Sequence, residues 1–207
     1  MLILVLEAST ASAKAMLYHS EKGIISVLNR NYSPESGDIA TYDADRIMDE
    51  TLWTGKELLA EHHVTHVDLV ATCSIWGHSL LMLDRDKKPV SRLKTWADTS
   101  AAVTTEKYRQ DVQLFNDLYQ RTGCPIHTTY TLWKYVHEKE HGAVDRVSYI
   151  STMPDYLFYR LTGDFSVAKS TISAGGFLNT HTLDWDEEAL RVAGITPDML
   201  PKLVESE

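Results

Sequence analysis

Three strand-like segments stand at the start of the chain, separated by short turns, and they limit the folds that the remainder can complete. They cover residues 1–6, 13–19 and 24–30, and each is apolar or partly alternating in polarity. The turns between them are too short for a crossover, so neighbouring strands must run antiparallel. The sequence therefore predicts a three-stranded antiparallel meander as the first part of a sheet.

Helix-like and strand-like segments alternate after this meander. A loop with Ser33, Pro34, Ser36 and Gly37 leads to Asp43, the expected N-cap of a long amphipathic helix. Further strands are expected over 66–72, 79–83 and 147–150, and helices over 101–119, 131–140, 154–161 and from 186. The apolar stripe of the first helix consists of Ala44, Ile47, Met48, Leu52, Leu58 and Leu59. This order predicts an α/β fold with a mixed sheet and helices packed on it.

The bulk composition excludes several classes of function. A formal net charge of −9 over 207 residues argues against nucleic-acid partners and against an anionic membrane surface. No run of about 18 apolar residues predicts a membrane span, and the apolar start lacks the basic region of a signal peptide. Cys73 and Cys124 fit reduced thiols, so a cytoplasmic location is expected.

The stretch LEASTASAK, residues 6–14, is the first candidate site. Backbone N–H groups with the Thr10 and Ser12 hydroxyls could cradle phosphate oxygens, with Lys14 close by. Glu7 could hold a hydrated Mg²⁺. The alternative is an ordinary hairpin turn with polar caps, and the residues alone favour that alternative.

Two further stretches could bind a polyhydroxylated ligand. CSIWGHSL, residues 73–80, follows a strand, and ligands of α/β sheets bind at the carboxyl ends of strands. Trp76 could offer an apolar face and His78 a hydrogen bond, or both could be structural. In TWADTSAA, residues 95–102, Trp96 could stack on a sugar ring while Asp98 binds hydroxyls; Asp98 could also cap a helix beginning near Ser100.

Two more stretches have a structural character. In GCPIHTTYTLWK, residues 123–134, His127 is expected to orient the loop before a helix. Residues 161–185 are rich in small and hydroxylated side chains, and Gly175 and Gly176 would allow close approach of another segment.

In this order and spacing, the five stretches resemble the N-terminal half of the FGGY carbohydrate kinases, nearest to gluconate kinases. PDYLFYRLTGDF at 154–165 and NTHTLDWDEEAL at 179–190 carry most of the resemblance. It implies a ribonuclease H-like, actin-like ATPase domain that binds the sugar, followed in the family by a second domain that binds most of the ATP. The reaction implied is transfer of the γ-phosphoryl group of MgATP to a sugar hydroxyl.

The resemblance also assigns roles by position. Glu7 stands where the family has a metal-associated Asp, and Thr10, Ser12 and Lys14 occupy the phosphate-hairpin positions. The substrate-binding positions are Trp76, His78, Trp96 and Asp98.

Some positions depart from the family pattern. Ser9 and Ala11 replace a glycine and a threonine of the hairpin, and Ser100 replaces an arginine. Counting back from NTHTLDW, the family's catalytic aspartate falls on Ala168, and Asp164 is a poor substitute. No catalytic residue can therefore be assigned.

These observations lead to one expectation for the chain as a whole. Residues 1–207 are expected to form a single FGGY N-terminal domain without the C-terminal nucleotide-binding domain. The expected function is the sugar-binding half of a kinase for a sugar, sugar acid or polyol, weakly active or inactive alone. The alternative is a non-catalytic sugar-binding or dimerising module, and the expected partners are a small sugar or polyol with a second copy or a missing C-terminal half.

Overall fold

The structure is a computed structural model that describes residues 1–32, 37–74 and 76–205. Ser33, Pro34 and Ser36 of the predicted loop lie outside these residues.

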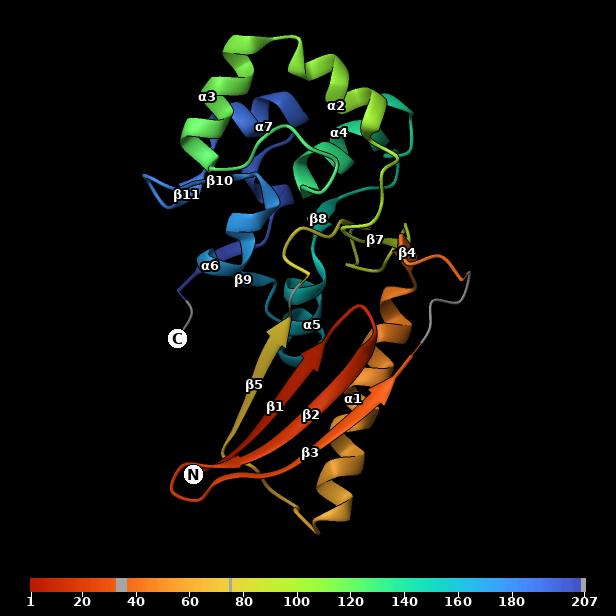
Figure 1. Cartoon of the computed structure of the whole chain (residues 1–207), viewed down its shortest axis with the longest axis vertical. Coiled ribbons are helices and arrows are strands. Elements are labelled where there is room, and N and C mark those ends of the chain that lie inside the picture. Colours follow the sequence, from red (N-terminus) through yellow and green to blue (C-terminus); the bar gives the residue numbers. More distant parts are fainter. Residues whose placement is uncertain (33–36, 75, 206–207) are drawn as a thin grey trace.

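A mixed four-stranded sheet forms one end of the molecule (Figure 1). Its strands are β1 (Leu2–Ala8), β2 (Ser12–His19), β3 (Gly23–Asn31) and β5 (Leu69–Ser74), in the order β3-β2-β1-β5. β1 pairs antiparallel with β2 and parallel with β5. The predicted meander and mixed sheet are confirmed.

One long helix, α1 (Ala44–Glu61), runs along a face of this sheet (Figure 1). Asp43 caps it as predicted, because its Oδ1 accepts a hydrogen bond from Arg46 N at 3.1 Å. Helix and sheet approach closely at Gly55, where an added Cβ would stand 2.7 Å from Leu6 Cδ2. The core between them consists of Leu4, Leu6, Ala15, Leu17 and Leu58 with their partly buried neighbours.

Most of the remaining helices gather beyond the carboxyl ends of β1 and β5 (Figure 1), and several of them surround a second core centred on Leu132, Trp133 and Phe177. The helix at 153–162 lies instead against β5 and α1, where Tyr156 and Leu157 share a core cluster with Met48. Short strands pair between the helices, two or three residues each. The elements are β4 (Thr41–Tyr42) with β7 (Leu93–Lys94), β6 (Leu81–Leu83) with β8 (Tyr149–Ser151), β9 (Ser166–Ala168) with β12 (Lys202–Val204), β10 (Leu178–Asn179) with β11 (Asp184–Trp185), the helices α2 (Ala102–Arg109), α3 (Val112–Thr122), α4 (Thr131–Glu140), α5 (Met153–Thr162), α6 (Lys169–Ile172) and α7 (Glu187–Ala193), and the 3₁₀ turns η1 (Ser173–Gly175) and η2 (Pro197–Met199).

The single helix predicted over 101–119 is wrong. Two helices, α2 and α3, occupy this region, and the chain breaks between them at Gln110 and Asp111. Asp111 has an extended backbone and its side chain accepts from Leu114 N at 3.0 Å, so it caps a new helix instead of continuing the old one. The strand predicted over 66–72 is likewise shifted to Leu69–Ser74.

Within the described part of the chain, every helix is too short or too polar to cross a membrane.

Candidate functional site

Direct hydrogen bonds join the loop after β5 to the end of β7 and to the first residue of α4. Leu80 and Lys94 exchange backbone bonds of 3.0 and 2.8 Å. Thr131 Oγ1 donates to the carbonyl of Ser79 at 2.9 Å. Three stretches that are remote in the sequence, around residues 78, 96 and 130, therefore meet in one place.

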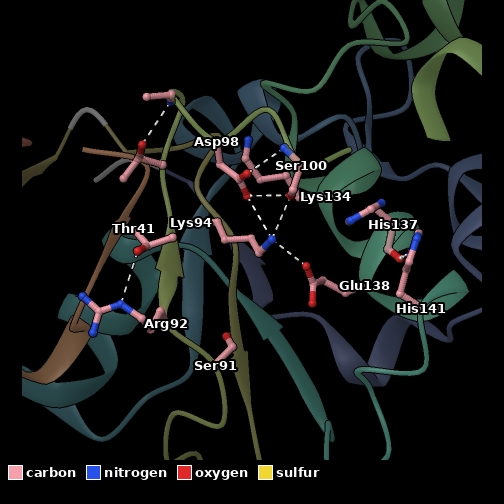
Figure 2. Close-up of polar contacts among 12 residues, drawn as sticks. Thr41, Ser91, Arg92, Lys94, Asp98, Ser100, Lys134, His137, Glu138 and His141 are labelled. Carbon is pink, nitrogen blue, oxygen red and sulfur yellow. Dashed lines mark hydrogen bonds and ion pairs between the residues drawn. The ribbon is translucent and has the colours of Figure 1, made fainter. Parts of the chain in front are cut away.

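Lys94 is the hub of the polar contacts at this meeting point (Figure 2). Its Nζ lies 3.0 Å from Asp98 Oδ2, 2.5 Å from Glu138 Oε1 and 2.9 Å from Ser100 Oγ. Burial alone would lower the pKa of Lys94, but the two carboxylates outweigh it and raise that pKa. The cation is therefore fixed between helix α4 and the loop at 95–101 that carries Trp96 and Asp98, called the W-x-D loop below.

Asp98 is buried, with 6 % of its surface exposed. Its Oδ1 accepts from Ser100 N at 2.8 Å and its Oδ2 from Ser100 Oγ at 3.0 Å. Burial would raise the pKa of Asp98, but the Ser100 bonds and the charge of Lys94 prevail and lower it. Asp98 therefore stays ionised, and it stabilises the turn just before α2, whose N-cap is Ala101.

The two candidate tryptophans lie in opposite environments. Trp96 is 52 % exposed, so its indole is open to a ligand. Trp76 is 3 % exposed and packs edge-to-face on Tyr42, with ring centroids 5.4 Å apart. Its Nε1 has no hydrogen-bond partner among the residues described. The structure thus places Trp76 inside the core, two residues before His78 in the same loop.

His78 is half-buried beside helix α4. Burial first, and then the nearby charge of Lys134, lower the pKa of its imidazole. A neutral imidazole offers one N–H donor and one acceptor, which suits hydrogen bonding to a hydroxyl. His127, by contrast, is exposed, and its Nδ1 accepts from Thr129 N at 3.2 Å, a contact that orients the loop.

Lys134 was not singled out from the sequence. It is 0 % exposed on α4, and its ammonium donates to the carbonyls of His78, at 3.2 Å, and of Thr129. Desolvation by burial lowers the pKa of Lys134 to about 7. The sequence feature that could have indicated its burial is that the neighbouring helical positions, Thr131–Val136, are otherwise apolar or small.

Side chains of the opening hairpin pair with one another and with Tyr42. Glu7 and Lys14 form an ion pair of 2.9 Å, with both groups partly exposed. The Ser12 hydroxyl is buried and lies 3.3 Å from Ser9 Oγ. Tyr42 OH donates to the carbonyl of Thr10 at 2.7 Å, which ties the hairpin to the aromatic pair of Tyr42 and Trp76.

The described residues contain no group of three or more metal-binding side chains. Mg²⁺ in kinases is commonly held by one or two carboxylates together with waters and phosphate oxygens, so a lone Glu7 is compatible with it. The ammonium of Lys14 already occupies Glu7 Oε1. Glu7 could therefore take a cation through its other oxygen or after Lys14 has turned away.

Ala168 ends β9 and immediately precedes α6. It lines a cavity of about 510 Å³ between β5, α5 and β9, together with Thr72 and Thr171. Asp155 also reaches this cavity, but its carboxylate accepts from Thr152 N at 2.9 Å and caps α5. Asp164 is exposed and lies just after the C-terminal end of α5. The loop that carries His78 contacts the other end of this helix, where Met153 N donates to Ser79 Oγ.

The segment after Ala168 packs against the His78 loop. A Cβ added to Gly77 would lie 2.5 Å from the carbonyl oxygen of Thr171, so only glycine fits this approach. Cys124 Sγ lies 3.3 Å from the carbonyl of Ser173, which joins the same segment to the loop before α4. The stretches 73–80, 123–134 and 161–185 therefore contact one another, and the opening hairpin is linked to Trp76 of the first stretch through Tyr42.

Comparison with known proteins identifies the family of this chain. The model of the FGGY family of carbohydrate kinases, N-terminal domain, matches residues 2–207. The gluconokinases of Bacillus licheniformis and Bacillus subtilis (strain 168) are 33% and 31% identical over 204 residues, covering 96% of this chain and 39% of theirs. The chain thus spans about two fifths of the length of these relatives.

Solved structures give the same picture of the fold. A gluconate kinase from Lactobacillus acidophilus superposes with a TM-score of 0.87 at 21% identity, covering 99% of this chain and 42% of its own. A xylulose kinase from Rhodospirillum rubrum superposes with a TM-score of 0.89 at 17% identity, with 99% and 43% covered. By sequence and by fold, the chain belongs to the FGGY family of carbohydrate kinases and carries their N-terminal domain.

Proposed function

We propose that residues 1–207 form the sugar-binding domain of an ATP-dependent kinase that phosphorylates a hydroxyl of a sugar, sugar acid or polyol. The observation that carries this proposal is the convergence of the His78 loop, the W-x-D loop and the loop before α4 around Lys94. A gluconate-like acceptor is favoured because two gluconokinases match 96% of the chain at 31–33% identity.

The acceptor would be bound by one exposed ring and two polar groups. Trp96 offers an apolar face of the kind on which sugar rings stack, and it is 52 % exposed. His78 and Asp98 would bond hydroxyls, because Asp98 Oδ1 retains acceptor capacity after its bond from Ser100 N. We assign Trp76 the supporting role of anchoring the His78 loop to the core through its packing on Tyr42.

The opening hairpin would face the phosphates. Lys14 is a partly exposed cation, and the hydroxyl of the partly exposed Thr10, in the turn before it, would meet a phosphate oxygen. When Lys14 turns to a phosphate, Glu7 is released to hold a hydrated Mg²⁺. Such a metal ion would neutralise charge on the transferring group.

We further propose a two-domain arrangement of the ribonuclease H-like type for the complete kinase. A domain that clamps the nucleotide would close over this one, and closure would exclude water from the reacting groups. Residues 1–207 alone are expected to be weakly active or inactive. The free thiols Cys73 and Cys124 are consistent with a cytoplasmic location.

A second candidate function is favoured by Ala168. The resemblance places the proton acceptor at this position, and alanine has no group that accepts a proton. A module that binds a sugar without phosphorylating it, alone or as a dimer, would keep Trp96 and His78 while losing this carboxylate.

Isothermal titration calorimetry on the purified chain tests the proposal. Gluconate, glycerol, xylulose and ribulose would be titrated separately, and MgATP in parallel. We expect saturable binding of one acceptor, lost in Trp96→Ala and weakened in His78→Asn. The exposed Trp53→Ala serves as the matched control, since Trp53 stacks on Arg30 of the sheet.

Two outcomes would count against it. Binding of none of the acceptors would contradict a sugar-binding domain. Binding that survives Trp96→Ala unchanged would place the acceptor elsewhere. An ATP-dependent phosphorylation assay on the same samples separates a kinase half from a non-catalytic module.

A further inference from the structure

Helix α4 carries two lysines that act as clamps on backbone carbonyls, in different surroundings. The Nζ of Lys139 donates to the carbonyls of Ala193 and Gly194, at 2.8 and 3.0 Å, at the end of α7. The Nζ of Lys134 donates to the carbonyls of His78 and Thr129. The first clamp joins two helices, whereas the second joins the two loops that flank the candidate acceptor site.

Lys134 is unusual for a buried lysine. It is 0 % exposed, and among the residues described no Asp or Glu forms an ion pair with it. A buried charge without such a partner is costly, so a lysine kept there needs a reason beyond packing. Its neighbours Asp98 and Lys94 belong to the network of the W-x-D loop (Figure 2).

We infer that Lys134 is a positioning residue for the acceptor site, which sets the His78 loop and the loop at Thr129 in the geometry that binds the sugar. This inference rests on the proposed function, because it concerns the same site. The clamp fixes backbone rather than side chains, so each carbonyl it holds also fixes the adjacent peptide groups.

The charge on Lys134 gives the inference a second consequence. The groups that face Lys134 are Asp98 from the W-x-D loop, Lys94 from β7 and His78 from the loop after β5. Because burial holds the pKa of Lys134 near neutrality, its ammonium loses a proton as the pH rises from 6 to 8.5. A neutral amine holds the two carbonyls less strongly than an ammonium does. The affinity for the acceptor is therefore expected to fall over this pH interval.

Lys134→Met and Lys139→Met form a matched pair for the test, since each removes one carbonyl clamp from the same helix. The first measurement is hydrogen exchange on the ligand-free chain. We expect Lys134→Met to raise exchange at least tenfold in peptides covering 76–80 and 126–131. Lys139→Met should raise exchange near 190–195 and leave those two loops unchanged.

The second measurement is acceptor affinity as a function of pH, by calorimetry with gluconate first and then the other acceptors. We expect Lys134→Met to weaken binding at least tenfold at pH 6.5 and to remove the pH dependence, while Lys139→Met keeps both. His78→Asn separates the titration of His78 from that of Lys134. Thermal unfolding identifies any variant that fails to fold, and Lys134→Gln then replaces Lys134→Met.

The two measurements fail independently. If the wild-type chain binds no acceptor, the proposed function fails, and hydrogen exchange alone still decides whether Lys134 holds the loops. If Lys134→Met leaves exchange in both loops at the wild-type level, the inference is overturned, whatever the chain binds. Unchanged affinity and pH dependence in a folded Lys134→Met would overturn it as well.

Discussion

Glu7 and Lys14 face each other across β1 and β2, and their side chains form an ion pair of 2.9 Å beside the opening hairpin. Both groups are partly exposed, so this pair contributes on the order of 0–1 kcal/mol to stability. The pair matters more for chemistry than for stability, because the charge of Lys14 neutralises the charge of Glu7 until one of them binds a ligand.

The first prediction concerns this pair. Lys14→Met should abolish the thermal shift that MgATP or inorganic triphosphate produces, with little change in the unfolding midpoint without ligand. Glu7→Gln should weaken the effect of Mg²⁺ and leave acceptor binding intact. Lys22→Met, at the exposed turn between β2 and β3, is the control. Loss of acceptor affinity in Glu7→Gln would place Glu7 in the sugar site.

The second prediction concerns Ala168. When the chain is combined with a nucleotide-binding domain, Ala168→Asp should raise the rate of ATP-dependent phosphorylation, because a positioned general base contributes roughly 10²–10⁴-fold. Asp164→Ala should change nothing, since Asp164 lies exposed after α5. The rate is measured with the acceptor that calorimetry identifies. An inert Ala168→Asp together with an inactive Asp164→Ala would show that the alignment register is wrong.

The sequence allowed the sheet and the first helix to be predicted, because their signals are local. Short turns force neighbouring strands to be antiparallel, and Asp43 lies next to the helix that it caps. The short pairs β4–β7 and β10–β11 were not predicted, since two residues are too few to show a period. The helix start at Asp111 was not predicted, because an aspartate inside a helical pattern can either continue the helix or cap a new one.

The candidate site was predicted as a set of stretches, and its internal contacts were not. The spacing of Trp96 and Asp98 marked them as candidates, whereas the bond between Lys94 and Glu138 joins residues far apart in the chain and leaves no local pattern. Lys134 escaped notice because a lysine is read as a surface residue unless its burial is known. Burial is a tertiary property, so the structure was needed to recognise this residue.

The third prediction is a pH dependence of stability that Lys134 causes. Its pKa is lowered from 10.5 to about 7 by burial, so between these values the unfolded chain holds a proton that the folded chain has lost. The free energy of unfolding therefore rises with pH from about 7 upward, by at most about 1.4 kcal/mol per pH unit. Below pH 7 both states are protonated and this contribution to the slope vanishes.

Urea unfolding at pH values from 6 to 9.5 would measure it. The difference in unfolding free energy between wild type and Lys134→Met should change steadily above pH 7, in favour of the wild type. The difference in unfolding free energy between wild type and Lys139→Met should stay constant over the same pH range. A flat difference for Lys134→Met would mean that Lys134 keeps an ordinary pKa.

The fourth prediction concerns Lys87, in the turn between β6 and β7. Its Nζ lies over the rings of Tyr149, Tyr159 and Phe165, at 4.4, 5.7 and 5.8 Å from their centroids. Lys87→Ala should lower the unfolding free energy by about 0.5–2 kcal/mol, the range of cation–π contacts. Lys88→Ala, exposed in the same turn, should have no measurable effect. Equal losses in the two variants would remove the cation–π explanation.

The fifth prediction tests the contact between the His78 loop and the segment after Ala168. A Cβ on Gly77 would stand 2.5 Å from the Thr171 carbonyl oxygen, and a backbone atom cannot move aside as a side chain can. Gly77→Ala should therefore destabilise the chain by about 1–3 kcal/mol, and it should weaken acceptor binding because the loop is displaced. Gly175→Ala is the comparison, since its new Cβ would meet the flexible Ile172 Cδ1 at 3.2 Å and cost less. Calorimetry and urea unfolding on both variants decide the matter: a Gly77→Ala chain as stable as Gly175→Ala, with full acceptor affinity, would show that the two segments are not coupled.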